Sequence, residues 1–326
     1  MSSEWATKKL LDVAKIIGGG TPSTAERSYW DGTVPWITPK DLSIHKDMYI
    51  ARGSRSITDL GLKKSSIKLV PAGTVLFTSR APIGYLAIAS QQLCTNQGFK
   101  NLVLNEGYDS RFFYYLLKYH TPDIEATATG STFKEISGSA LGKFDVLVPD
   151  THSQKQIGQF LSSLDDRIRL LRETNKTLEG VAQAIFKSWF VDFDPVRAKA
   201  AGRKPEGMDE ETASLFPDSF EDSELGFIPK GWRVSKIGLE LKSVLGGTPS
   251  RINKNYWLNG SIPWINSGKV NEFRITTPTE FITEDALMRS STRLLPARTT
   301  VLAITGATLG QISIAEVPVC ANQSVI

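Results

Sequence analysis

Cysteine and histidine are scarce in this chain of 326 residues, which contains two cysteines and three histidines. Two cysteines are too few for the disulfide framework that stabilises small secreted domains. His45, His120 and His152 stand far from one another and from the cysteines, so the spacings typical of structural zinc sites are absent. We therefore expect no metal site in this chain.

Long apolar runs are also missing. Charged residues interrupt every apolar stretch well before the ~20 residues that a membrane-spanning helix needs, and residues 1–9 lack the apolar core of a signal peptide. Apolar residues make up 40% of the chain and charged residues 22%, a composition typical of globular proteins. These features predict a cytoplasmic protein that is long enough for two domains.

Catalytic motifs are absent as well. The glycines at 18–20 are not followed by the lysine of a phosphate-binding loop, and no serine lies in a Gly-x-Ser-x-Gly elbow. The sequence Asp192-Phe193-Asp194-Pro195 resembles the motif of amino-methyltransferases only superficially, because it follows a long helical pattern instead of ending a strand. We therefore expect a binding protein that is not itself an enzyme.

The strongest positive feature is an internal repeat, in which turn and strand elements recur in the same order. The elements of the first copy are Gly19–Ser23, Tyr29-Trp30, Pro35–Ile37, Pro71-Ala72, Gly84 and Asn96-Gln97. Those of the second copy are Gly246–Ser250, Tyr256-Trp257, Pro263–Ile265, Pro296-Ala297, Gly310 and Asn322-Gln323. The repeat predicts two domains of one fold, each built on glycine- and proline-containing turns and short buried strands.

The copies differ in extent and in local sequence. They diverge at Thr38–Lys40 against Asn266–Gly268 and at Ser79–Ala81 against Thr305–Ala307, which is what two domains reading different targets would show. The first copy continues to a strand near residue 148, whereas the second ends soon after Asn322-Gln323. We expect an α+β fold with two repeated domains of mixed sheet and helices, the second one incomplete.

A long helix is predicted between the copies, because residues 153–190 contain no proline and carry a heptad apolar seam. The seam positions are Ile157, Leu161, Leu164, Ile168, Leu171, Asn175, Leu178, Ala182, Ile185 and Trp189. Asn175 is the one polar member, and a polar residue at this position fixes register and partner number in coiled coils. The seam favours a coiled-coil helix over a helix that is packed on its own domain's core.

The charge is unevenly distributed along the chain. Residues 206–229 hold eight acidic residues and no lysine or arginine, so without them the net charge rises from +4 to +12. A basic remainder suits a polyanionic partner. With four prolines between residues 194 and 231, the acidic segment is predicted to be a solvated linker, which gives domains at 1–151, 152–192, 193–230 and 231–326.

Three segments of the sequence are similar to the specificity (S) subunits of type I restriction–modification systems, the HsdS family. They are residues 11–37 with the Gly-Gly-Thr-Pro-Ser and Tyr-Trp elements, residues 144–157 with Gln154-Lys155-Gln156-Ile157, and residues 182–197 with Ile185–Phe193. The segments occur in the family's order, and the resemblance covers nearly the whole chain. The resemblance implies that each globular domain is a target-recognition domain reading half of a bipartite, asymmetric DNA sequence.

The resemblance also implies partners. The spacer helix would dock two methyltransferase subunits, which bind S-adenosylmethionine, and restriction/translocase subunits, which use ATP and Mg, would join them. No cofactor is expected on this chain. Members of the family normally complete the second domain and add a second spacer helix, so the seam here lacks that intramolecular partner and self-association through the helix is a further expectation.

Residues that contact DNA are expected where the copies diverge, because donors and acceptors on loops read bases and basic residues hold phosphates. In the first copy these are Thr38, Lys40, Arg52, Arg55, Ser79, Arg80, Ser131, Thr132 and Lys134. In the second they are Asn266, Lys269, Arg274 and Thr305. Thr21 and Thr248 lie in the shared turn and are expected to be structural.

Two other functions fit the same sequence. One is a structural adaptor that holds partner proteins by its helix without reading DNA. The other is the targeting subunit of a related methylation or defence system that lacks the translocase.

Overall fold

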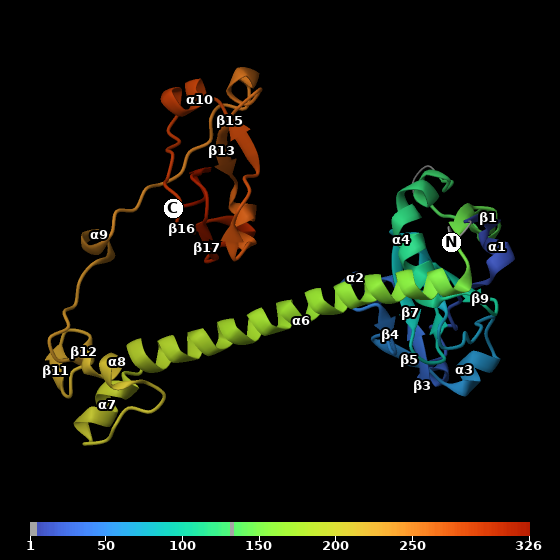
Figure 1. Ribbon diagram of the computed structural model, residues 1–326, viewed down its shortest axis with the longest axis horizontal. Coiled ribbons are helices and arrows are strands. Elements are labelled where there is room, and N and C mark those ends of the chain that lie inside the picture. The colour runs from blue at the N-terminus through green and yellow to red at the C-terminus, as the bar shows by residue number, and fades with distance from the viewer. Residues whose placement is uncertain (1–4, 131–133) are drawn as a thin grey trace. The chain divides into compact units, whose positions relative to one another are not determined.

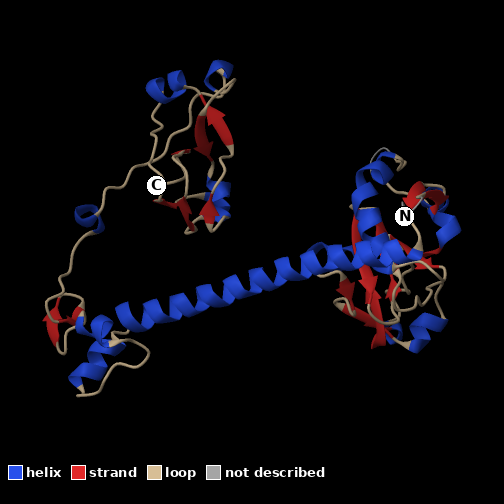
Figure 2. Ribbon diagram, viewed as in Figure 1, coloured by secondary structure: helices blue, strands red, loops and turns tan. Residues whose placement is uncertain are grey.

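The computed structural model describes residues 5–130 and 134–326. By its internal contacts the chain divides into two compact units, Met1–Ala184 and Ile185–Ile326. Each unit contains one copy of the repeat, and each copy is built of short strands and mostly short helices (Figure 1, Figure 2). The fold is α+β, with two recognition-domain regions and one long helix.

The first copy is built on a five-stranded sheet in the order β2-β9-β6-β7-β4, antiparallel except where β4 lies parallel to β7. The strands are β2 (Ala14–Gly18), β9 (Phe99–Leu104), β6 (Val75–Ser79), β7 (Ile83–Ala89) and β4 (Tyr49–Ile50). Side chains alternate between the two faces of a strand. Val75 and Phe77 pack into the cluster that contains Phe113 of α4 (Ser110–Ala126), whereas Leu76 packs on the opposite side with Ile37.

Two smaller sheets complete the first copy. In one, β3 (Trp30–Ile37) is antiparallel to β5 (Arg55–Ile57) and parallel to β8 (Cys94–Thr95). In the other, β1 (Ala6–Lys9) pairs with β10 (Asp145–Val148). The remaining short helices are α1 (Leu10–Val13), η1 (Arg27–Tyr29), α2 (Pro39–Ile44), α3 (Asp59–Lys63) and α5 (Gly138–Gly142).

The second copy repeats the pairings of β3 with β5 and β8 and those of β7 with β6 and β4, whereas its described residues show no counterpart of the β2–β9 and β1–β10 pairings and only a single bridge in place of the β6–β9 pairing. Trp36 faces Cys94 across a parallel ladder in the first copy, and Trp264 faces Cys320 in the second. The strands of the second copy are β13 (Ile262–Ile265), β14 (Arg274–Ile275), β15 (Glu280–Ile282), β16 (Thr299–Leu302), β17 (Ile312–Ala315) and β18 (Cys320–Ala321). Its helices are α9 (Ile237–Glu240), η2 (Lys254–Tyr256), η3 (Ser267–Asn271), α10 (Glu284–Arg289) and η4 (Gly306–Thr308). The predicted repeat is therefore a repeat of topology, and the two cysteines are buried in equivalent strands.

Helix α6 (Thr151–Phe190) is 40 residues long, and its first turns dock on the first copy. The Gln154 side chain accepts from the Asp109 backbone N–H at 3.1 Å and donates to the Pro149 carbonyl at 2.8 Å. Gly158 lies so close to α4 that a Cβ would come 2.8 Å from an Asp109 oxygen. From Ser163 to Lys187 every residue is exposed, so the alternative of a helix packed on its own domain's core is wrong.

The segment expected to be a plain linker contains secondary structure. It forms α7 (Asp194–Ala200), α8 (Glu210–Ser214) and an antiparallel hairpin of β11 (Phe220–Ser223) and β12 (Gly226–Pro229). Phe216 is buried, and its ring lies within 6 Å of the rings of Trp189 and Phe190. The prolines and acidic residues suggested a solvated chain, but these aromatic side chains supply a small apolar core. Within the described ranges, no helix is long and apolar enough to cross a membrane.

Candidate nucleic-acid interface

Two turns meet in each copy. In the first copy they are Gly19–Ser23 and the turn that follows Thr95, and in the second they are Gly246–Ser250 and the turn that follows Ala321. Gly20 N–H donates to the Thr95 carbonyl at 2.9 Å, and in the second copy Gly247 N–H donates to the Ala321 carbonyl at 2.7 Å. The approach requires glycine at the preceding position, because a Cβ at Gly19 would come 1.8 Å from the carbonyl oxygen of Asn96. The turns that the sequence identified thus form the rigid frame of both domains.

The frame is completed by side chains that both copies share. The Trp36 indole N–H donates to the Gly20 carbonyl at 2.9 Å, and the Trp264 indole to the Gly247 carbonyl at 3.2 Å. Thr21 is hydrogen-bonded to Gln97, and the Thr248 hydroxyl donates to Gln323 Oε1 at 2.5 Å. Both threonines therefore hold one turn against the other, which supports the structural role expected for them.

In the first copy, α2 begins beside this frame. The Thr38 hydroxyl donates to Asp41 Oδ2 at 2.6 Å, and the Thr38 oxygen caps α2 by accepting from Asp41 N–H at 3.3 Å. Burial alone would raise the pKa of Asp41, but hydrogen bonds from Thr38 and Ser54 outweigh burial and lower it. Thr38 is thus occupied within the domain, whereas Lys40 projects as an exposed side chain.

Ser79 and Arg80 have different surroundings although they are adjacent. Ser79 ends strand β6 and is fully buried, and its hydroxyl donates to the Gly98 carbonyl at 3.2 Å; the expectation that it lies on an open loop is wrong because the strand extends through it. Arg80 lies at the surface, with a guanidinium nitrogen 3.5 Å from Glu135. Lys100 is 3.2 Å from the same carboxylate, so Glu135 partly neutralises both cations.

Local contacts link the segments that carry the first-copy candidates. The Ser54 N–H donates to Asp41 at 2.8 Å, which ties the segment with Arg52 and Arg55 to the start of α2. A Cβ at Gly98 would lie 3.2 Å from Pro39 and 3.7 Å from the Arg80 side chain. Lys134 is exposed, and Ser131 and Thr132 lie outside the described residues. The contacts thus connect the segment of Arg52 and Arg55 with the start of α2, and the start of α2 with Arg80 through Gly98.

The second-copy candidates are arranged differently. Asn266 caps η3 by accepting from the Lys269 N–H at 3.3 Å, which is the place of Thr38 in the first copy. The Lys269 ammonium lies 2.6 Å from Glu272, and Arg274 is paired with Glu316. Thr305 is exposed. Both basic candidates of this copy are therefore engaged by carboxylates.

Sequence reasoning missed several residues of these surfaces. Glu135 and Lys100 were not proposed, and neither was the ion pair of Arg251 with Glu280, in which a guanidinium nitrogen lies 2.5 Å from the carboxylate. The Arg251 guanidinium lowers the pKa of Glu280. A signal existed for Arg251 alone, because it directly follows the shared Gly-Gly-Thr-Pro-Ser element.

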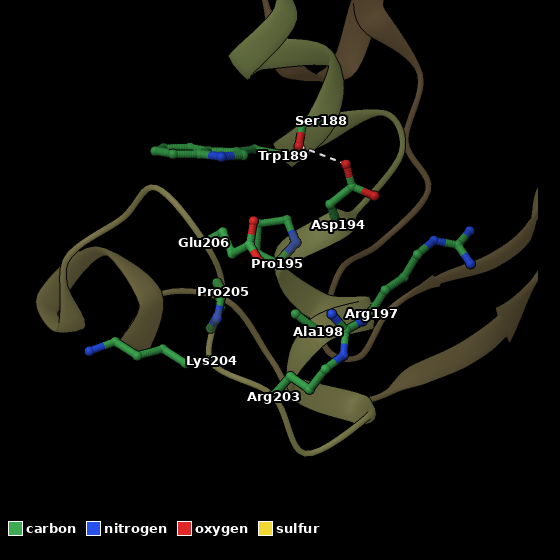
Figure 3. A pocket seen from close by; sticks show the side chains of 10 residues that line it. All are labelled: Ser188, Trp189, Asp194, Pro195, Arg197, Ala198, Arg203, Lys204, Pro205 and Glu206. Carbon is green, nitrogen blue, oxygen red and sulfur yellow. Dashed lines mark hydrogen bonds between the residues drawn. The ribbon is translucent and has the colours of Figure 1, made fainter.

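A hollow of about 390 Å³ lies in the folded segment after α6, lined by Trp189, Pro195 and Pro205 among others (Figure 3). The Ser188 hydroxyl donates to Asp194 at 2.7 Å at its edge. Two of its three basic side chains are occupied, since Lys204 pairs with Glu210 at 3.0 Å and Arg197 Nε donates to the Asp192 carbonyl at 2.9 Å; the third is Arg203. The hollow therefore presents no obvious binding chemistry.

The described residues contain neither a metal-binding cluster nor an activated thiol. No cluster of three histidine, cysteine or acidic side chains able to hold a metal occurs among residues 5–130 and 134–326. Burial raises the pKa of the Cys94 thiol to about 12, and it also raises the pKa of Cys320. Neither thiol is therefore activated as a nucleophile.

Comparison with known proteins agrees with this geometry. Residues 2–180 and 229–326 match the family described as type I restriction modification DNA specificity domain, one match for each copy of the repeat. The chain belongs to this family. It is the non-catalytic DNA specificity subunit of a type I restriction–modification system.

Among its relatives, the MjaIX specificity subunit of Methanocaldococcus jannaschii is 36% identical over 97% of this chain and 69% of its own length. The HindI specificity subunit of Haemophilus influenzae is 29% identical over 61% of this chain and 52% of its own length. The crystal structure of the S subunit from M. genitalium matches 99% of this chain and 72% of its own, with a TM-score of 0.45 and 16% identity. The folded segment between residues 181 and 228 lies outside the family match of this specificity subunit.

Proposed function

We propose that the two domains, residues 1–151 and 231–326, each read one half of a bipartite DNA sequence, and that α6 sets the distance between the halves. Support comes from the repeat, in which one buried frame carries different exposed donors in the two copies. At ~1.5 Å per residue, a helix of the observed 40 residues is about 60 Å long. That length is comparable with more than one turn of B-DNA.

The first-copy surface is the proposed place of DNA contact, through Lys40, Arg52, Arg55, Arg80 and Lys134. These side chains lie beside turns that the buried frame holds in place, and positioned contacts to bases or phosphates require such a support. Asn266, Lys269, Arg274 and Thr305 are the proposed counterparts in the second copy.

The exposed face of α6 is the proposed docking surface for two methyltransferase subunits. Leu164, Leu171 and Leu178 of the seam are exposed. Leu170 and Val181, also exposed, lie about 100° around the helix from the seam residues beside them. A face this wide can contact more than one partner helix, so methyltransferase helices and a second copy of α6 both fit.

The catalytic chemistry is then proposed to reside on the partners. S-adenosylmethionine would be bound by the methyltransferase subunits, and ATP and Mg by restriction/translocase subunits. We assign this chain none of these cofactors.

Methylome sequencing tests the proposal directly. A host carrying this gene with its methyltransferase should methylate a two-part motif with a constant gap, and deletion of the gene should remove that methylation. A contiguous motif, or methylation that persists without the gene, would overturn the proposal.

A binding experiment tests the surface. Arg80→Ala should weaken binding to the selected duplex several-fold, because a charge-assisted contact is lost. Lys9→Ala, on the separate β1–β10 sheet, is the matched control and should bind as the unaltered protein does. Equal affinity of both variants across a salt titration would remove Arg80 from the interface.

A further inference from the structure

Arg52 and Arg55 border a hollow of about 210 Å³ on the surface of the first copy. The hollow is also lined by the hydroxyl-bearing residues Thr33, Ser54 and Ser56 and by Gly53. No acidic residue lines it, and in the described part of the chain neither guanidinium forms an ion pair with a carboxylate. The charged side chains that line the hollow are therefore hydrogen-bond donors. The buried Asp41 carboxylate lies behind Gly53 and Ser54, where it accepts from the Ser54 N–H at 2.8 Å and from the Thr38 hydroxyl at 2.6 Å.

Arg55 is held in position by an aromatic ring. Its guanidinium carbon lies 3.6 Å from the centre of the Trp30 ring, and Trp30 is buried and donates through its indole to the Ser23 carbonyl at 3.1 Å. A guanidinium stacked on a ring keeps its N–H groups in its own plane and available to an acceptor. The stack therefore presents Arg55 to an anion without occupying its donors.

The second copy changes the same place. Trp36 pairs with Arg55 across β3 and β5, and Trp264 pairs with Glu280 across β13 and β15, so Glu280 occupies the position of Arg55. Counting along the strand, Thr277 corresponds to Arg52 and Phe281 to Ser56.

A guanidinium still covers the equivalent tryptophan, but it comes from a different position. Arg251 lies 3.6 Å from the centre of the Trp257 ring. It donates twice to Glu280, at 2.5 and 2.9 Å. Both copies thus keep a cation on the ring, and among the described residues only the cation of the first copy forms no ion pair.

We propose that the hollow beside Arg52 and Arg55 binds one backbone phosphate of DNA, and that the second domain has no phosphate site at the equivalent place. A phosphate offers acceptors only, which matches the guanidinium donors and the hydroxyl donors together. The acceptor pair of a guanine edge would also match an arginine, and duplexes of different base composition separate the two. The inference rests on the proposed DNA-binding function and deepens it, because it assigns this part of the interface to positioning and not to sequence reading.

The test is a salt titration of DNA binding by the full chain, using labelled 30-base-pair duplexes of random AT-rich and GC-rich sequence. Each phosphate contact adds about 0.9 to the slope of log affinity against log salt. The double variant Arg52→Gln/Arg55→Gln should therefore lower the slope by about 0.9 and weaken binding to both duplexes equally. Arg55→Lys, which keeps the charge, should retain the slope.

Two control variants separate this site from general charge and from folding. Lys9→Gln/Lys143→Gln removes two charges elsewhere on the same domain, and Arg251→Gln/Glu280→Gln removes the paired charges of the second; both should keep the slope. An unchanged slope in Arg52→Gln/Arg55→Gln, or an equal fall in the Lys9/Lys143 control, would overturn the inference. So would a loss for one duplex only, which would indicate base reading.

Two further outcomes are distinguishable. If inorganic phosphate raises the melting temperature of the unaltered chain but not of Arg52→Gln, while the DNA slope is the same in both, the hollow binds free phosphate and the inference is wrong. If the unaltered chain binds neither these duplexes nor a selected one, the proposed function itself fails.

Discussion

The two copies of the repeat share a buried frame and differ in exposed charge. Trp36 and Trp264 make the same hydrogen bond to the same turn, and the strand pairings have the same register. At the surface, Arg55 is unpaired within the described residues where the second copy has the ion-paired Glu280. The comparison teaches that one scaffold can carry two different exposed surfaces, because the residues that fix the fold are buried and differ from those that carry the exposed charges.

Truncation of the buried tryptophan should destabilise both copies to the same extent, and this loss of stability is the largest effect that we expect. Trp36→Ala and Trp264→Ala each remove a buried indole, and such truncations cost about 3–5 kcal/mol. Urea unfolding, followed by a probe in each unit, measures the loss. Trp5→Ala, at a half-exposed residue, is the control with a small effect. If either substitution lowered the free energy of unfolding by less than 1 kcal/mol, the two buried tryptophans would not stabilise their copies to the same extent.

Two glycines of α6 compare its docked part with its exposed part. Gly158→Ala should destabilise the docking, because the new Cβ would lie 2.8 Å from an Asp109 oxygen and 2.9 Å from the Phe112 nitrogen. Overpacking of this kind costs about 1–3 kcal/mol. Gly180→Ala has nothing within 4 Å and should stabilise the helix by about 1 kcal/mol. Thermal unfolding should show a lower melting temperature for Gly158→Ala and a higher one for Gly180→Ala. A higher melting temperature for Gly158→Ala would contradict the docking of the first turns of α6.

Acid should weaken the first copy at a place where the second has no carboxylate. The pKa of Asp41 is lowered in the folded state by its hydrogen bonds, so its contribution to stability is present above its unfolded pKa of about 3.9 and is lost as pH falls through the folded value. Asp41→Asn should therefore destabilise the protein at pH 7 and flatten the loss of stability below pH 4. An unchanged acid-unfolding profile would refute this role. Lys269→Gln, at the equivalent position, serves as the control.

The ion pair of the second copy should have the smallest effect. Arg251 and Glu280 are half-exposed, and exposed pairs contribute about 0–1 kcal/mol. Glu280→Gln should thus change stability by less than 1 kcal/mol by urea unfolding. The same substitution should increase DNA affinity slightly, because Arg251 is no longer neutralised. A decrease in DNA affinity would contradict this expectation.

The frame could be predicted from the sequence because glycine, proline and tryptophan at fixed spacing mark turns and buried strands locally. The long helix could be predicted because its heptad seam is also local. The ion pairs of the basic residues could not be predicted, because their acidic partners are distant in the sequence. Glu135 is 35 residues from Lys100, and Glu316 is 42 residues from Arg274. Burial of Ser79 depends on tertiary packing of β6, and the folded segment after α6 depends on aromatic contacts between Trp189, Phe190 and Phe216.

The central claim is that two related domains contact one duplex at separate places held apart by α6. Hydroxyl-radical footprinting of the full chain with its methyltransferase on a selected duplex tests it most directly. The account predicts two protected stretches with an accessible gap, and loss of high-affinity binding when two base pairs are inserted in that gap. A single uninterrupted footprint, or binding that tolerates the insertion, would contradict it.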